Sequence, residues 1–322
     1  MLSGAVVQGF GLESRRVHRE KSYFVVATGT GSLIVRKSLD ARNCIEFAHA
    51  IKEHLAENGF KHTDRFLLSR DGKPFVEHEG DVYVCTELHQ LREACFADPE
   101  DVLAVVSQVG LMHKLAEGFA APRRINDISK MDDDIVWAVR RDISDMVAIK
   151  KKIGLNGGLS DFDVIFIKNY NFYLGVMEEV LQEITATSIN EYVQHAKAEG
   201  NIVHNRLKEE TLLLGNGEVY IENFTGSRPG YCIFDLTALI SRYIGENLGD
   251  ALPVFALLEQ YDKKRSLRLE DIRIVMSLLR YPFKFIRLCR SHYSKRRTWT
   301  PSSILGKMHE IINMQENYYR QV

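Results

Sequence analysis

The chain has 322 residues, enough for two lobes or domains, and its 45% hydrophobic and 26% charged residues are ordinary for a folded protein. Its 42 basic and 43 acidic side chains leave a formal net charge of −1, which favours neither nucleic acid nor an anionic membrane as a partner. No apolar run approaches the roughly 20 residues that a membrane-spanning helix needs. We therefore expect no membrane span and no nucleic-acid partner.

Five scattered cysteines, none of them in a C-x-x-C pair, predict buried free thiols in a reducing compartment. No histidine cluster has zinc-finger spacing, so we expect no metal. The N-terminal stretch MLSGAVVQGFGLESRR has no basic segment ahead of its short apolar part and does not resemble a signal peptide. These features predict synthesis in the cytoplasm.

The first ninety residues predict a small antiparallel sheet with one helix. Residues 23–27 and 33–35 are rich in β-branched and aromatic side chains and flank the turn sequence T-G-T-G, which is typical of a hairpin. Apolar residues then recur at helical spacing between residues 42 and 57, namely Ile45, Ala48, Ile51 and Leu55. The turn pairs Asp71-Gly72 and Glu79-Gly80 separate two further short strands.

From residue 98 onward the pattern becomes helical. Asp98-Pro99-Glu100-Asp101 combines a cap, a proline at the first helical position and acids in the first turn. Amphipathic helices are predicted over residues 132–153 and 162–184, and again from residue 234 to the end. One hairpin interrupts them near residues 211–224, where two apolar segments flank G-N-G. The fold class is therefore α+β, with a small lobe over residues 1–88 and a helical lobe over residues 89–322.

A sheet lobe followed by a helical lobe with one inserted hairpin is the plan of a protein kinase, in which H-R-D-L-x-x-x-N and D-F-G flank the hairpin. The corresponding stretches here are HNRLKEET, residues 204–211, and NFT, residues 223–225. His204 fits, but Arg206 stands at the position of the catalytic base, and a guanidinium cannot accept a proton. Thr211 and Asn223 stand where a kinase uses Asn and Asp to hold magnesium.

The first lobe also lacks residues that an active kinase carries. The cation that binds ATP phosphates belongs on the third strand, where the chain has Arg36, with Lys37 on the opposite face. The glutamate that should pair with this cation from the next helix is replaced by Ala48. In the kinase count, which makes the strand of Arg36 the third and the strand at residues 23–27 the second, no glycine lies between the first two strands, where a loop covering the phosphates would need it.

Six stretches carry a family resemblance by their order and spacing: FAHAIKEHLAENGF, DGKPFVEHEGDVYVCTEL, VSQVGLMHKLAEGF, EYVQHAKAEGNIVHN, FDLTALI and RYPFKFIRLCRSHYSKRRTWTP. Over residues 46–322 the chain resembles the CotS-type spore-coat family, relatives of the aminoglycoside and choline phosphotransferases. The resemblance implies a bilobal protein-kinase-like fold. Members of the family commonly carry acids at the positions held here by Ala48, Arg206 and Asn223, so it also implies a catalytically degenerate member.

Five other predictions concern the hairpin region. We expect His204 to be packed and bonded to backbone, and Asp235 to be the N-cap of its helix. The family resemblance implies in addition that Asp235 accepts backbone N–H groups from the loop near His204. Arg206 needs carboxylate partners, for which the candidates are Glu209, Glu210, Glu222 and Asp235. Glu222 could also replace the lost metal ligand, although neighbouring side chains of a strand face opposite ways.

These features predict a spore-coat-associated, pseudokinase-like structural or interaction protein with no cofactor. The resemblance implies other proteins of the spore coat as partners. Two alternatives stay open: an active small-molecule kinase with a non-standard metal site at Glu222, and a pseudokinase that keeps a regulatory ligand. The basic run from Lys284 to Arg297, with its interleaved aromatics, is interpreted as a solvated helix face rather than a nucleic-acid site.

Overall fold

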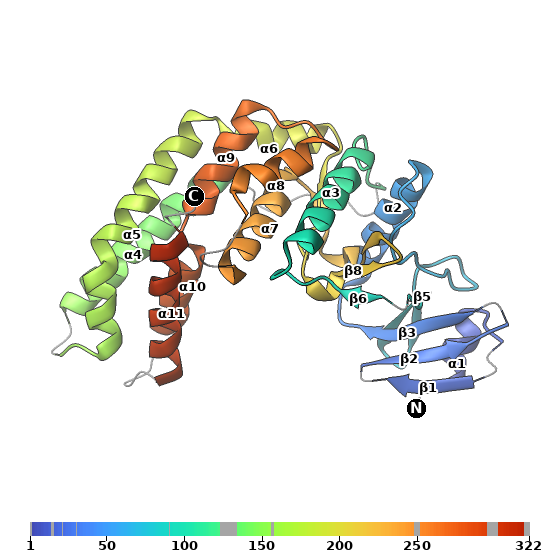
Figure 1. Ribbon diagram of the computed structural model, residues 1–322. Helices are drawn as coiled ribbons and strands as arrows, with labels where there is room; N and C mark the ends of the chain where they lie inside the picture. The colour runs from blue at the N-terminus through green and yellow to red at the C-terminus, as the bar shows by residue number, and fades with distance from the viewer. Residues whose placement is uncertain are drawn as a thin grey trace. The chain divides into compact units, whose positions relative to one another are not determined.

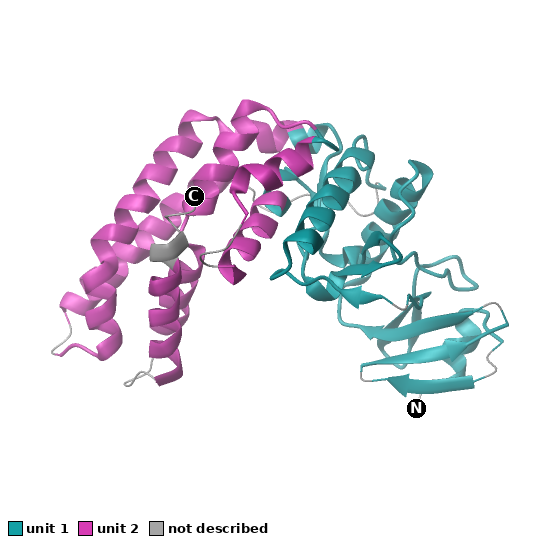
Figure 2. Ribbon diagram, in the orientation of Figure 1, with its two compact units in different colours: residues 1–131, 196–235, 263–265 teal, residues 132–195, 236–262, 266–322 magenta. Residues whose placement is uncertain are grey.

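The structure is a computed structural model, and it describes residues 2–13, 16–20, 22–29, 31–89, 91–122, 134–155, 158–247, 252–294 and 302–318. The chain forms two compact units, which Figure 2 shows in different colours. Unit 1 comprises residues 1–131, 196–235 and 263–265, and unit 2 comprises residues 132–195, 236–262 and 266–322.

Unit 1 contains a five-stranded antiparallel sheet in the order β1-β2-β3-β5-β4 (Figure 1). Its strands are β1 (Arg16–Glu20), β2 (Tyr23–Ala27), β3 (Ser32–Ser38), β4 (Val76–His78) and β5 (Asp81–Glu87). The predicted turn at Glu79-Gly80 joins β4 to β5, and both residues have positive φ, as a two-residue hairpin turn requires. Only residues 21 and 22 separate β1 from β2, so that connection contains no glycine.

Two helices accompany the sheet. The helix α2 (Arg42–Glu57) has the predicted bounds and buries its apolar stripe. The short helix α1 (Gly4–Gly9) was not predicted; Ser3 caps it, and Val6 packs with Phe10 against Val26 and Val35 of the sheet. Six residues are too few for a recognisable helical period, which is why the sequence pattern missed α1.

The rest of unit 1 holds α3 and several short strands. The predicted signals at Asp98 and Pro99 begin α3 (Pro99–Leu115), and the Asp98 carboxylate accepts the Glu100 N–H at 2.9 Å. The predicted hairpin is formed by β8 (Leu212–Gly215) and β9 (Glu218–Ile221), and β6 (Arg92–Glu93) pairs with β8. A second small sheet pairs β7 (Ile202–Val203) with β10 (Arg228–Pro229), and short 3₁₀ turns cover Glu209–Thr211 and Phe224–Gly226.

Unit 2 is helical. Its helices are α4 (Ile135–Gly154), α5 (Asp161–Ala186), α6 (Ile189–Ala198), α7 (Ile233–Glu246), α8 (Val254–Asp262), α9 (Leu269–Arg280), α10 (Phe283–Ser294) and α11 (Ser302–Tyr318), of which α6 and α7 also reach into unit 1. The helices α4 and α5 pack along one another, as Figure 1 shows. The basic residues Lys295 to Arg297 lie outside the described residues, so the interpretation of that run stays a prediction.

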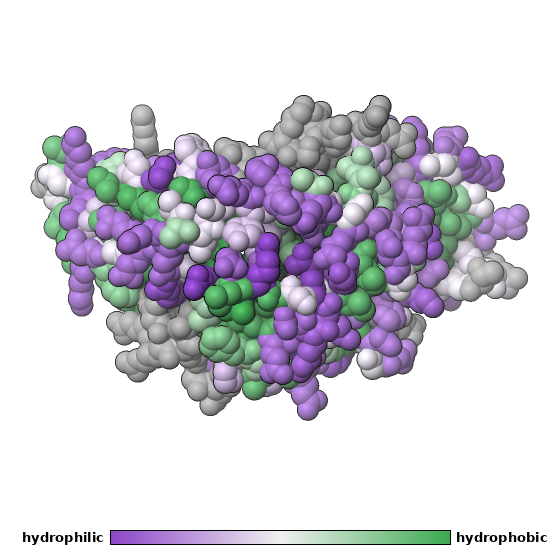
Figure 3. Space-filling model, turned by 90° about the horizontal axis from the view of Figure 1, so that it is seen from above, coloured by the Kyte–Doolittle hydropathy of each residue, from purple (hydrophilic) through white to green (hydrophobic). Residues whose placement is uncertain are grey.

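Among the described helices, none combines the length and the apolar character needed to cross a membrane. The face drawn in Figure 3 is mainly hydrophilic, with apolar side chains in small separate groups. This agrees with the ordinary composition of the chain and its net charge of −1.

Candidate functional site

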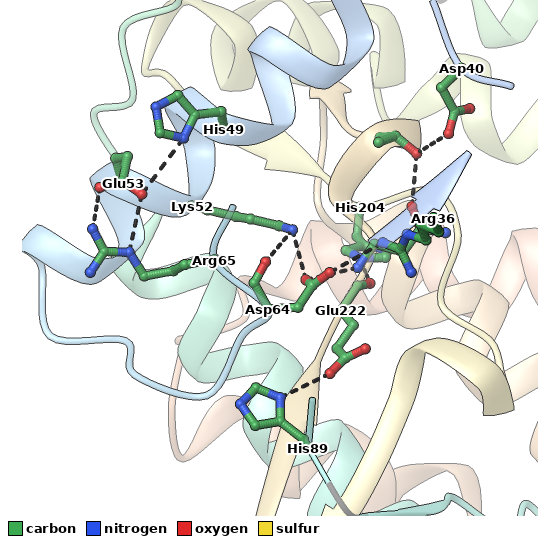
Figure 4. Close-up of polar contacts among 12 residues, drawn as sticks. Arg36, Asp40, His49, Lys52, Glu53, Asp64, Arg65, His89, His204 and Glu222 are labelled. Atoms are coloured by element: carbon green, nitrogen blue, oxygen red, sulfur yellow. Dashed lines mark hydrogen bonds and ion pairs between the residues drawn. The ribbon is translucent and has the colours of Figure 1, made fainter. Parts of the chain in front are cut away.

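The predicted phosphate-binding cation, Arg36, lies on β3 and points toward a buried carboxylate, Asp64 (Figure 4). Its Nη2 is 3.4 Å from Asp64 Oδ2. The neighbouring Lys37 faces the other way and pairs with Asp81 at 2.6 Å, half exposed. The predicted alternation of these two basic residues across the strand is therefore observed.

The principal partner of Asp64 is Lys52, which is fully buried on α2. Lys52 Nζ lies 2.7 Å from Asp64 Oδ1 and donates to the Asp64 backbone carbonyl at 2.6 Å. The ammonium also lies 3.9 Å from the centroid of the Phe66 ring. Burial works against the Asp64 carboxylate, but the charges of Lys52 and Arg36 outweigh it and hold the pKa of Asp64 below its usual range.

Our sequence reasoning missed Lys52, although a signal was present. Lys52 is four residues after Ala48 and seven after Ile45, so it lies on the apolar stripe that α2 buries. A lysine on such a stripe needs a buried acid. Ala48 itself is completely buried, and the acid expected there is absent. The helix thus supplies a cation one turn later, and the acid comes from Asp64 in the segment after α2.

The same carboxylate connects to the hairpin region. The Asn223 backbone N–H donates to Asp64 Oδ1 at 3.1 Å. Asn223 has a left-handed backbone, φ 59°, which asparagine tolerates better than most residues. Three groups therefore contact Asp64: the side chains of Arg36 and Lys52 and the backbone N–H of Asn223. Arg36 and Asn223 are predicted site positions, and Lys52 is not.

Arg206, at the predicted position of the catalytic base, pairs with Asp40, whose Oδ1 is 2.9 Å from Nη2. Its Nη1 donates to Thr225 Oγ1 at 2.9 Å, and that hydroxyl lies 2.8 Å from both Asp40 Oδ2 and Asn223 Oδ1. Gly226 permits this path, because a Cβ there would meet Arg206 Cγ at 2.5 Å. Arg206 does have a carboxylate partner, but the four predicted candidates were wrong: the partner comes from the segment between β3 and α2.

The two positions at which a kinase holds magnesium, Thr211 and Asn223, do not offer a suitable set of ligands. Thr211 Oγ1 accepts the Lys208 N–H at 3.0 Å and lies 2.8 Å from the Arg206 carbonyl, so it is occupied within its own loop. Asn223 Oδ1 faces the Thr225 hydroxyl. Mg²⁺ prefers carboxylate oxygens, and among the described residues no group of three or more His, Cys, Asp or Glu side chains could hold a metal ion. The residues present do not fit a divalent cation.

His204 is fully buried and packed, as predicted. Its Nε2 lies 3.0 Å from the Glu222 carbonyl, and its ring packs edge-on against Phe224 with 4.6 Å between centroids. Burial lowers the pKa of His204 to about 4, so the ring is neutral at pH 7.

Asp235 bonds to the loop around His204. Its Oδ2 accepts the His204 backbone N–H at 2.5 Å, its Oδ1 accepts the Asn205 N–H at 2.9 Å, and His113 Nε2 is 3.1 Å from Oδ2. Burial opposes the charge, yet these bonds lower the pKa of Asp235. The N-cap prediction was wrong, because α7 begins at Ile233 and Asp235 lies inside its first turn.

Glu222 takes part in a different pair. Its Oε1 lies 3.1 Å from Nδ1 of His89, just after β5, and both side chains are mostly buried. The hydrogen bond that Glu222 accepts from the His89 ring is the main reason that the pKa of His89 is raised. Figure 4 shows this pair beside the Asp64 cluster rather than within it.

Comparison with known proteins identifies the family of this chain. The family model described as "Spore coat putative kinase YutH" matches residues 4–322. The endospore coat-associated protein YutH of Bacillus subtilis (strain 168) is 20% identical over 305 residues, which are 91% of this chain and 84% of that protein. These matches confirm the predicted resemblance to a kinase-like spore-coat family.

Solved structures give the fold. An aminoglycoside phosphotransferase from Alicyclobacillus acidocaldarius matches with a TM-score of 0.86 at 18% identity, covering 99% of this chain and 94% of that one. Amicoumacin kinase, solved with AMP-PNP and Ca²⁺, matches with a TM-score of 0.62 at 10% identity, covering 96% and 90%. The predicted α+β, protein-kinase-like fold with a small antiparallel sheet and a larger helical part is confirmed. The chain belongs to the family described as Spore coat putative kinase YutH.

Proposed function

We propose that this chain is a structural or interaction protein of the spore coat, and that its phosphotransferase-like site is degenerate and transfers no phosphate. The observation that carries the proposal is the arginine at the predicted base position. Arg206 pairs with Asp40 and shares the Thr225 hydroxyl with Asn223. A positive charge therefore lies among the groups that should accept a proton and hold a cation.

Two further features support the loss of activity. Arg36 is directed at Asp64, which Lys52 and the Asn223 N–H already engage, rather than at a glutamate from α2. The turn between β1 and β2 has no glycine, so it lacks the close backbone approach that a phosphate-covering loop uses. Phosphoryl transfer depends mainly on positioned charges, and the charged groups here bind one another.

The coat assignment rests on the family and on the name of its Bacillus subtilis relative. The function would then be exerted through contacts with other coat proteins. A fluorescent fusion produced in a sporulating Bacillus should form a ring at the spore surface. Fluorescence spread evenly through the mother cell would contradict this part of the proposal.

Binding of Mg-ATP tests the site directly. A ligand present at 100 times its dissociation constant stabilises a folded protein by about 2.7 kcal/mol, which raises the midpoint of a chain this long by several degrees. We expect no shift with millimolar Mg-ATP, whereas amicoumacin kinase under the same conditions provides the positive control. Phosphate release should also equal the uncatalysed background.

The other outcomes distinguish the alternatives. A shift that needs magnesium, and that is abolished by Glu222→Gln, would establish the non-standard metal site and overturn the proposal. A shift with ATP or ADP that is independent of magnesium, without turnover, would instead identify a pseudokinase that retains a ligand.

A further inference from the structure

The outer edge of β1 is open. The strand lies at one end of the sheet, β2 is its one partner among the described strands, and all five of its residues, Arg16 to Glu20, are exposed (Figure 1). The opposite edge differs, because β4 packs against α1 and a Cβ at Gly9 would lie 2.9 Å from Val76. An uncovered edge presents unpaired N–H and C=O groups that can pair with another strand.

The sequence of β1, R-V-H-R-E, is complementary to itself when two copies run antiparallel. Centred on His18, the pairing sets Arg16 opposite Glu20 of the second copy, Glu20 opposite its Arg16, and Val17 opposite its Arg19. Residues directly opposite have Cβ atoms about 4.5–5.5 Å apart, within reach of an ion pair. Arg16, His18 and Glu20 share one face of the sheet, so both ion pairs form on that face.

The other registers lack this complementarity. A shift of one residue in one direction places Arg16 of each copy opposite Arg19 of the other copy. A shift of one residue in the other direction places Val17 of each copy opposite Glu20 of the other copy. A shift of two residues sets either Arg16 or Glu20 opposite His18. An in-register parallel arrangement brings like charges together. The charges therefore favour one register. Edge charges that serve only to prevent pairing would favour no register.

We propose that two copies of this chain associate by antiparallel pairing of their β1 strands, which joins the two sheets into one. The contact is two-fold symmetric, since the same strand serves both copies, and its backbone pairing is that of strand addition at a sheet edge. Within each chain His18 lies 3.6 Å from Glu20, but both side chains are about half exposed and free to re-pair. This inference goes beyond the proposed function and does not depend on the loss of phosphate transfer.

Charge reversal tests the pairing in the full chain by light scattering and sedimentation up to the highest concentration at which the chain stays soluble, because a contact this small forms a weak interface. Arg16→Glu and Glu20→Arg should each weaken dimerisation about tenfold, the equivalent of 1.4 kcal/mol, because each homodimer then has like charges opposite one another. An equimolar mixture of the two variants should form heterodimers, and the double variant should recover wild-type association.

Arg19→Glu is the matched control. It changes the net charge by the same amount on the same strand, but Arg19 faces Val17 of the other copy on the opposite side of the sheet. It should leave dimerisation near the wild-type level, and circular dichroism should show all variants folded. The proposal is overturned if the wild-type chain is monomeric at every concentration, if Arg16→Glu has no effect, or if Arg19→Glu is as disruptive as Arg16→Glu.

Cysteine cross-linking tests the register. His18→Cys should form an intermolecular disulfide under mild oxidation, because opposed residues have Cα atoms about 4.5–5.5 Å apart and disulfides span 4.4–6.8 Å. Val17→Cys should cross-link much more slowly, since residue 17 faces residue 19. The unaltered chain measures the background from the exposed Cys95. Equal rates for the two variants would refute the register.

Discussion

Replacing Lys52 by methionine tests whether the buried Lys52–Asp64 pair organises the candidate site. Methionine has a similar length and suits the apolar surroundings on α2, so the main change is the loss of the ammonium. Asp64 would then be buried with only Arg36, 3.4 Å away, and the Asn223 N–H as partners. Removing one partner of a buried pair costs about 3–5 kcal/mol when the remaining charge is left uncompensated, and the nearby Arg36 places the expected cost at the lower end of that range. We expect Lys52→Met to lower the free energy of unfolding by that amount.

Lys37→Met is the matched control. Lys37 also pairs with an aspartate at close range, Asp81 at 2.6 Å, but its side chain is half exposed and water screens the pair. This variant should be nearly neutral. The double variant Lys52→Met, Asp64→Asn should recover much of the loss, because the amide oxygen can still accept the Asn223 N–H while no charge stays buried.

Urea denaturation of the four proteins measures these differences, and the pH dependence checks their origin. In Lys52→Met the pKa of Asp64 in the folded state should rise, because the largest charge that opposes burial is lost while Arg36 and the Asn223 N–H remain. Its penalty is therefore present above that pKa and disappears as the pH falls and the carboxyl is protonated. The wild-type pair behaves oppositely, since the lowered pKa of Asp64 gives stability that is lost in acid. A cost for Lys52→Met no larger than that of Lys37→Met would refute the reasoning.

Two further predictions concern the loop around His204. Asp235→Ala should lower the free energy of unfolding by about 1–3 kcal/mol, because the His204 and Asn205 N–H groups lose their acceptor. Denaturant titration measures this change. A neutral result would show that water replaces the carboxylate. His204 is neutral in the folded protein, with a pKa of about 4 against an ordinary value of 6.5. Its stabilising effect is therefore complete above pH 6.5 and is lost as the pH falls toward 4, by roughly 2 kcal/mol at pH 5. His204→Asn should flatten the stability profile between pH 7 and 5, and an unchanged slope would assign the effect to other groups.

Much of the local structure followed from short-range signals. The period of α2, the capping residues of α3 and the G-N-G turn of the β8–β9 hairpin each involve neighbours within a few residues, and all three predicted elements are present. The arginine at position 206, where a kinase has its catalytic base, could also be recognised from the sequence, because it depends on residue identity within a motif of known spacing.

The partners of these residues could not be recognised in this way. Asp40 is 166 residues from Arg206, and Asp64 is 159 residues from Asn223. Any of several acids could pair with a half-buried arginine, and only the path of the chain decides which one reaches it. The carboxylates that seemed near in sequence, such as Glu222, instead bind other groups. Here the sequence alone indicated the longer helices, the central hairpin and the family, and it showed which residues stand at the expected catalytic positions. The tertiary structure decided which charges neutralise one another, because ion pairing depends on distances in space that no periodicity or local propensity encodes.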